Sequence, residues 1–169
     1  RIDNVAPEAN IINIHHGNKI NPYINYPFLK TDTLKKYVAA AHQLDKKVKL
    51  YYTVRELTVR SPETFALRSL GHEVYLPGQG IKGNITGESW MCEHLIDDYQ
   101  YSWHQYFGND QWDEAIAQTG LSRWHNFYLE GVNWLIKNMG IDGLYIDVFG
   151  YDREITKRLR KVMDRARPG

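Results

Sequence analysis

Cysteine, strong net charge and long apolar runs are all scarce in this sequence. The single cysteine, Cys92, excludes an internal disulfide bond. The formal net charge is only +1, and no basic block alternates with aromatic residues, which argues against a nucleic-acid partner. No run of about 18 apolar residues is present, so the sequence predicts no membrane span.

Several short catalytic motifs are also absent. No G-x-G-x-x-G follows the first apolar segment and no G-x-x-x-x-G-K-[ST] occurs, which disfavours dinucleotide-binding and nucleoside-triphosphatase folds. No G-x-S-x-G elbow is present, which disfavours a serine hydrolase. His15 and His16 are adjacent and therefore point to opposite faces of a strand, and neither H-x-H nor H-E-x-x-H occurs. We therefore predict neither a cofactor nor a metal site, with a metal-dependent hydrolase using His15 or His16 as an alternative.

Aromatic residues are plentiful, with 12 Tyr and 5 Trp among 169 residues. Flat rings with a polar tip suit sugar-binding clefts, although they also fill ordinary cores. Tyr26, Trp90 and Trp103 are the candidate sugar platforms.

Strand and helix patterns alternate along the chain, which is typical of an α/β fold with parallel strands. The length is too short for a complete (β/α)₈ barrel of about 250 residues. We therefore expect a partial TIM-type barrel of three or four parallel strands with an open flank, spanning residues 1–169 and forming part of a longer polypeptide. The expected strands are Ala9–His16, Val48–Val54, a weak His72–Leu76 and Leu144–Val148, and the expected helices begin near Thr31, Ser61, Ser122 and Ile155.

Residues 77–120 interrupt this alternation. Glycines punctuate the segment, aromatic residues crowd into it, and no clean hydrophobic period appears before Glu93. We expect a long, irregular, aromatic-rich insertion with a helix within Glu93–Phe107, and a long excursion of this kind is usually functional.

The stretch Ile141–Arg153, IDGLYIDVFGYDR, is the most informative part of the chain. An apolar run suited to a buried parallel strand is interrupted near its end by one acid, Asp147. A carboxylate at a buried strand end is costly unless it is paired or has a task. Catalytic groups of (β/α) barrels lie at the C-terminal strand ends, so Asp147 is the first catalytic candidate. The alternative is a structural role, capping the next helix or pairing with Arg55 or Arg153.

Polar residues follow each expected strand, and in a parallel sheet they converge at one edge. Glycoside hydrolysis needs two carboxylates, and Asp147 and Glu56 form the natural pair, with Glu93 as a third candidate from the insertion. Glu56 has a structural alternative, an ion pair with Arg55. The residues expected to contact substrate are the platforms named above together with His15, His16, Asn18, Arg55 and Asp152.

Six motifs together resemble a known group. NIHHGN, NPYINYPF, YYTVREL, ALRSLG, SRWHNFYLEGVNWL and GIDGLYID with a following DR are similar to bacterial proteins related to glycoside hydrolase family 123. The resemblance implies a TIM-barrel catalytic domain that acts on a poly- or oligosaccharide or a host glycan and is secreted, periplasmic or on the outer surface. Enzymes similar to family 123 use an adjacent Asp-Glu pair, and the pair in this chain is Asp113-Glu114. At the position of a second acid after the one matching Asp147, this chain has Val148.

These observations predict a glycoside hydrolase that works by carboxylate acid–base chemistry, with the rest of the parent polypeptide as its partner. A non-catalytic glycan-binding barrel that retained the cleft is the alternative from another functional class.

Overall fold

The computed structural model describes residues 7–53, 56–58, 60–78, 101–108, 111–117, 122–147 and 153–168. For 101–108 and 111–117 the description covers the backbone alone.

A three-stranded parallel sheet forms the first layer of the molecule. Its strands are β1 (Ile11–Ile14), β2 (Lys47–Tyr51) and β6 (Gly143–Tyr145), in the order β1-β2-β6. In register, Ile14 pairs with Leu50, and Tyr51 pairs with Tyr145. The parallel arrangement confirms the predicted α/β class. The described strands form an open sheet and not a closed barrel.

Alternation along β2 separates the two faces of this sheet. Val48 and Leu50 are completely buried and pack under the helices, whereas Lys47 is exposed and Lys49 half-buried on the opposite face. The helical face holds most of the hydrophobic core, while the opposite face is the one that would face a barrel interior. The largest fully buried side chains are Trp124, Tyr52, Tyr75, Tyr128, Ile24, Leu34, Leu50, Leu57 and Leu135.

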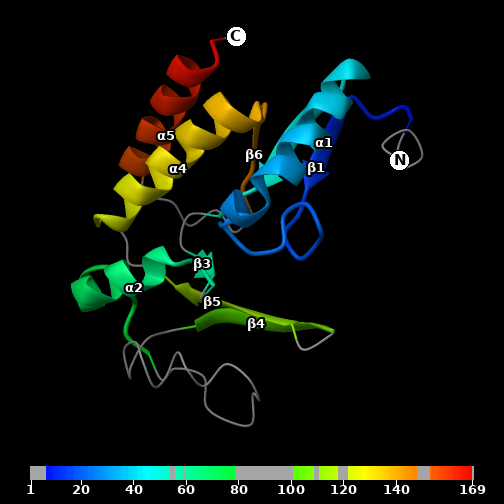
Figure 1. Cartoon of the computed structure of the whole chain (residues 1–169). Helices are drawn as coiled ribbons and strands as arrows, with labels where there is room; N and C mark the ends of the chain where they lie inside the picture. The colour runs from blue at the N-terminus through cyan, green and yellow to red at the C-terminus, as the bar shows by residue number, and fades with distance from the viewer. Residues whose placement is uncertain are drawn as a thin grey trace.

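Three helices accompany the parallel strands (Figure 1). α1 (Thr31–Gln43) connects β1 to β2, α4 (Trp124–Met139) precedes β6, and α5 (Arg153–Ala166) follows it. The backbone N–H of Trp124 donates to Ser122 Oγ at 3.2 Å, and α4 begins two residues after this serine. Gly140 ends α4 at φ 76°, a left-handed conformation that favours glycine. A short helix, α2 (Glu63–Leu67), and two 3₁₀ helices, Pro27–Lys30 and Arg68–Glu73, complete the helical elements described.

A second sheet lies beyond the C-terminal ends of the parallel strands (Figure 1). It contains β3 (Glu56–Thr58), β4 (Tyr101–Gly108) and β5 (Gln111–Ala117) in the order β3-β5-β4, with antiparallel pairing throughout. Part of the 77–120 insertion is therefore a β-hairpin, whose strands β4 and β5 pair with two register shifts. The prediction of a helix within Glu93–Phe107 is wrong at residues 101–107, which belong to strand β4. The aromatic residues of this segment favour strands. Residues 79–100 lie outside the described part.

Two further expectations about elements need correction. The prediction of a weak strand at His72–Leu76 is wrong. A 3₁₀ helix runs to Glu73, and the residues that follow it form only isolated β-bridges. The strand expected to reach Val54 ends at Tyr51. Among the helices described, none is long and apolar enough to cross a membrane.

Candidate active site at the C-terminal strand ends

A row of three ring side chains crosses the parallel sheet at the C-terminal ends of its strands. We call this row, formed by His15, Tyr51 and Tyr145, the aromatic rung. Tyr51 pairs in register with Tyr145, and His15 directly follows Ile14, the partner of Leu50. The Tyr51 ring centroid lies 4.2 Å from that of His15 and 5.5 Å from that of Tyr145. Tyr51 is only 6% exposed, whereas His15 and Tyr145 are exposed on either side of it. The rung thus presents two accessible rings around a buried phenol.

One carboxylate is hydrogen-bonded to the hydroxyl of Tyr51, and a second acts on it through its charge. This hydroxyl donates a hydrogen bond to Asp147 Oδ2 at 3.3 Å. Burial, followed by the negative charges of Glu56 and Asp147, raises the pKa of the Tyr51 phenol above its usual value. The charge of each carboxylate thus acts on the same phenol, and a shared catalytic role of Asp147 and Glu56 stays a prediction.

A buried amide fixes the segment that carries Glu56. Asn25 is fully buried and has a backbone φ of 51°. Its side-chain amide nitrogen donates to the carbonyl oxygens of Thr53 and Glu56, both at 2.5 Å. Its side-chain oxygen accepts the Thr53 N–H at 2.8 Å. Thr53 Oγ1 then donates to Glu56 Oε2 at 2.6 Å. The loop before α1 therefore sets the geometry of the chain after β2.

The residues after β1 lie beside this rung. The His16 ring centroid is 4.9 Å from that of Tyr51, and burial, with a smaller effect of His15, lowers the pKa of His16 to about 4. At neutral pH His16 is therefore uncharged. Asn18 shapes its own loop: its amide donates to the His15 carbonyl at 2.7 Å, and its Oδ1 accepts from the N–H groups of Ile20 and Asn21, each at 2.9 Å. Substrate contact by Asn18 stays a prediction.

The platform prediction for Tyr26 is wrong. Tyr26 is 4% exposed and packs edge-on against Phe28 at 5.2 Å in the core, so it offers no ring face to a sugar. Burial and the neighbouring Glu63 raise its pKa. Trp103 lies in β4, where the description covers the backbone alone, and the remaining candidates, Arg55, Trp90, Glu93 and Asp152, lie outside the described residues.

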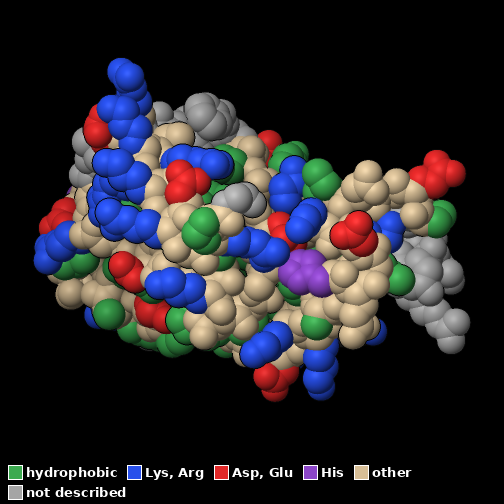
Figure 2. Space-filling model, turned by 90° about the horizontal axis from the view of Figure 1, so that it is seen from above, with side chains coloured by type: hydrophobic (Ala, Val, Ile, Leu, Met, Phe, Trp, Pro, Cys, Tyr) green, Lys and Arg blue, Asp and Glu red, His purple; other side chains and the backbone are tan. Residues whose placement is uncertain are grey.

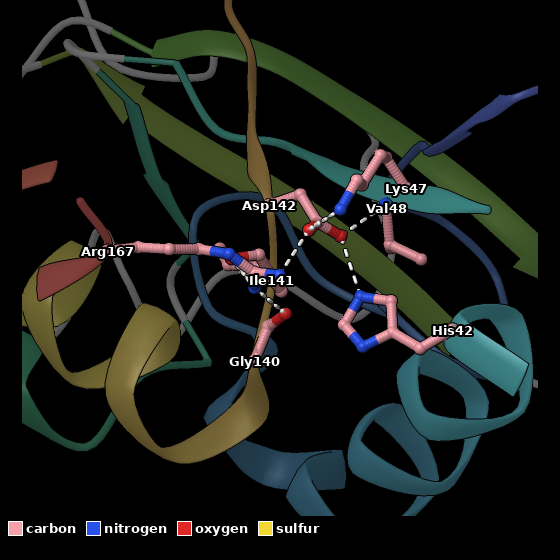
Figure 3. Close-up of polar contacts among 7 residues, drawn as sticks. All are labelled: His42, Lys47, Val48, Gly140, Ile141, Asp142 and Arg167. Atoms are coloured by element: carbon pink, nitrogen blue, oxygen red, sulfur yellow. Dashed lines mark hydrogen bonds and ion pairs between the residues drawn. The ribbon is translucent and has the colours of Figure 1, made fainter. Parts of the chain in front are cut away.

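The opposite end of the sheet carries a second polar cluster, around Asp142, just before β6 (Figure 3). Asp142 Oδ2 lies 2.8 Å from His42 Nε2 and accepts the Val48 N–H at 2.8 Å, while Oδ1 lies 2.7 Å from Arg167 Nη2. Burial alone would raise the pKa of Asp142, but the hydrogen bonds from His42 and Val48 and the charge of Arg167 lower it below 3.8. This end of a β/α sheet supports stability rather than catalysis.

A cavity of about 310 Å³ lies at this N-terminal end. Its lining includes Lys47, Asp142, Met163 and Arg167. Figure 2, which looks onto this end of the molecule, shows Lys and Arg side chains interspersed with Asp and Glu. The cavity lining has four cationic side chains (Lys47, Lys49, Arg160 and Arg167) and two carboxylates (Asp142 and Asp164), and it includes neither Asp147 nor Glu56. We assign it no catalytic role.

Comparison with known proteins decides the family. The family model described as "Glycoside hydrolase 123, TIM-barrel domain" matches residues 2–169. The chain belongs to this family. Membership in the glycoside hydrolase 123 TIM-barrel family confirms the resemblance carried by the sequence motifs. A comparison with curated proteins finds no match.

Solved structures support the fold of this glycoside hydrolase 123 domain. A cyclomaltodextrinase is similar with a TM-score of 0.58 at 14% identity, over 99% of this chain and 29% of that one. The Nostoc punctiforme debranching enzyme soaked with acarbose has a TM-score of 0.57 at 17% identity, over 94% of this chain and 35% of that one. The α-amylase of Geobacillus thermoleovorans complexed with acarbose has a TM-score of 0.52 at 15% identity, over 88% of this chain and 28% of that one. The chain thus spans about a third of the length of these proteins, and the similarity concerns the fold alone.

Four residues of the candidate site in this domain were not predicted from the sequence: Asn25, Tyr51, Thr53 and Tyr145. Period-two alternation could have indicated Tyr145, because it precedes the candidate Asp147 by two residues and so shares its face of the strand. No local signal marked Asn25, whose partners lie 28 and 31 positions away.

The described residues of this glycoside hydrolase 123 domain contain no group of three or more His, Cys, Asp or Glu side chains placed to hold a metal ion. We therefore assign no described residue to a metal or cofactor.

Proposed function

We propose that this chain forms part of the catalytic barrel of a glycoside hydrolase, in which Asp147 and Glu56 carry out the chemistry. The observation that carries the proposal is that Asp147, just after β6, accepts a hydrogen bond from the Tyr51 hydroxyl, on which the charge of Glu56 also acts. The family match supports the reaction class. The substrate would be a poly- or oligosaccharide, and the remaining strands of the barrel would come from further parts of the same polypeptide. Export from a bacterial cell is part of the same proposal.

The two carboxylates would have different roles. Asp147 is half-buried beside a neutral phenol, and we assign it to the positive charge that develops on the sugar, as nucleophile, base or electrostatic stabiliser. Glu56 accepts a hydrogen bond from Thr53 and would protonate the leaving oxygen as general acid. Tyr145, exposed on the rung, offers a ring face for a sugar.

The first test of this proposal is turnover. The complete native protein is incubated with a panel of poly- and oligosaccharides and aryl glycosides, and release of reducing ends or phenol is measured. Hydrolysis of at least one substrate is expected. If the protein binds glycans of the panel but hydrolyses none of them, the result would contradict the proposed hydrolase activity and favour a non-catalytic glycan-binding barrel.

The second test separates the carboxylates by leaving group. Glu56→Gln removes the proposed acid, so hydrolysis of glycosides with poor leaving groups should fall by about 10²-fold or more, within the range for general acid catalysis. Hydrolysis of dinitrophenyl glycosides by Glu56→Gln should fall much less, because their leaving group needs no proton. Asp164→Asn, an exposed carboxylate paired with Arg160 on α5, is the matched control. Equal losses on both substrate types would exclude Glu56 as the acid.

A further inference from the structure

The buried phenol of the aromatic rung has no part in the acid–base assignment above. Tyr51 is 6% exposed, so it offers almost no surface to a substrate. Rings of His15 and Tyr145 contact it on either side, at centroid distances of 4.2 and 5.5 Å, and Ile24 packs in the same small cluster. These contacts fix the direction of the ring, and with it the position of the hydroxyl.

The hydroxyl of Tyr51 points at a proposed catalytic group. It donates to Asp147 Oδ2, and the distance of 3.3 Å is at the long end for a hydrogen bond between oxygens. Such bonds often shorten once substrate is bound. The raised pKa of the phenol keeps the proton on Tyr51 at neutral pH, so Tyr51 is a donor rather than a nucleophile.

We propose that Tyr51 is a positioning residue for glycoside hydrolysis, whose hydroxyl fixes the orientation of the Asp147 carboxylate toward the sugar. The inference rests on the proposed function. Asp147 follows β6, and the rigid β2 residue Tyr51 supplies a donor from the neighbouring strand. A carboxylate held in the wrong orientation is misaligned with the sugar, and misalignment of about 1 Å can reduce a rate by about 100-fold.

The test uses Tyr51→Phe in the complete native protein. Phenylalanine retains the ring that contacts His15 and Tyr145 and removes only the hydroxyl. The matched control is Tyr75→Phe, because Tyr75 is fully buried in the core and its hydroxyl donates to the Thr64 carbonyl at 3.2 Å. On the best substrate of the panel, Tyr51→Phe should lower kcat by about 10- to 100-fold with KM within about two-fold of wild type. Tyr75→Phe should leave both constants unchanged.

A crystal structure of Tyr51→Phe separates this inference from the proposed function. We expect the Asp147 carboxylate to leave its wild-type rotamer or to occupy more than one. A carboxylate that keeps its orientation, or a kcat equal to that of Tyr75→Phe, overturns the inference. If the wild-type protein hydrolyses nothing, the proposed function fails, and the Asp147 rotamer still decides whether Tyr51 orients that side chain.

Discussion

Asp142 is the described carboxylate whose removal should cost the most stability. Its side chain is 8% exposed and accepts the Val48 N–H. In Asp142→Ala that buried N–H loses its partner, at a cost of about 1–3 kcal/mol. His42 and Arg167 are about a third exposed, so each lost contact counts for only about 0.5–1 kcal/mol after screening by solvent. We expect a total destabilisation of about 3 kcal/mol.

Asp142→Asn should cost less than Asp142→Ala. The amide oxygen can still accept the Val48 N–H, while the charge that faces Arg167 is lost, so we expect about 1–2 kcal/mol. The free energy of unfolding is measured by urea titration. Asp164→Ala, which removes an exposed ion pair with Arg160, is the control and should change it by less than about 0.5 kcal/mol.

The contribution of Asp142 should depend on pH with a defined sign. Its pKa is lowered in the folded protein, so the ionised carboxylate adds stability above the pKa of the unfolded chain, about 3.9. That stability disappears as the pH falls through the lower, folded pKa. The difference in free energy of unfolding between wild type and Asp142→Asn should therefore narrow as the pH falls below about 4. A gap that stays the same at pH 3, or a cost of Asp142→Ala below 0.5 kcal/mol at pH 7, would refute this reasoning.

Two further predictions concern packing and the loop before α1. Gly131→Ala places a Cβ 2.9 Å from the Tyr52 hydroxyl oxygen and 3.2 Å from Phe28, so it should destabilise by about 1–3 kcal/mol in a urea titration despite the better helix propensity of alanine. Asn25→Ala removes the acceptor of the Thr53 N–H and forces a left-handed alanine, so it should cost more than about 2 kcal/mol, and Asn25→Gly should recover about 1 kcal/mol of this. If Asn25→Ala and Asn25→Gly are equally stable, the left-handed backbone conformation at this position does not contribute to the loss of stability.

Local patterns were sufficient to predict the parallel part of the fold. Capping residues and helical periodicity located α1 and α4, and the apolar run before Asp147 located β6. The pairing of β5 with β3 was missed because it joins positions about 60 residues apart, which no local period reveals. The hairpin itself joins neighbouring segments, such as Tyr106 with Trp112, and was missed for a different reason. The aromatic residues of 101–107 were read as helical, whereas the backbone pairs them as a strand.

The carboxylates of the proposed site stand out in the sequence, whereas the residues that contact them do not. Asp147 follows a parallel strand, at the end where a barrel places its catalytic groups. Glu56 begins β3 of the antiparallel sheet, so parallel topology alone does not place it. Asn25 and Tyr51 act through tertiary contacts with groups on other elements, so their roles emerge only once the chain is folded. Tyr26 shows the converse error, because an aromatic residue in a polar loop can still belong to the core.

The two aspartates on either side of β6 allow the most direct test of the proposed active site. Asp142→Asn and Asp147→Asn make the same chemical change at opposite ends of one strand, and melting temperature and turnover are measured on the same preparations. We expect Asp147→Asn to keep or raise the melting temperature and to lose at least about 100-fold in turnover, because the developing positive charge loses its partner. Asp142→Asn should melt lower with near-normal turnover. An Asp147→Asn protein that is clearly less stable yet turns over substrate normally would show that Asp147 is structural and would contradict the proposed active site.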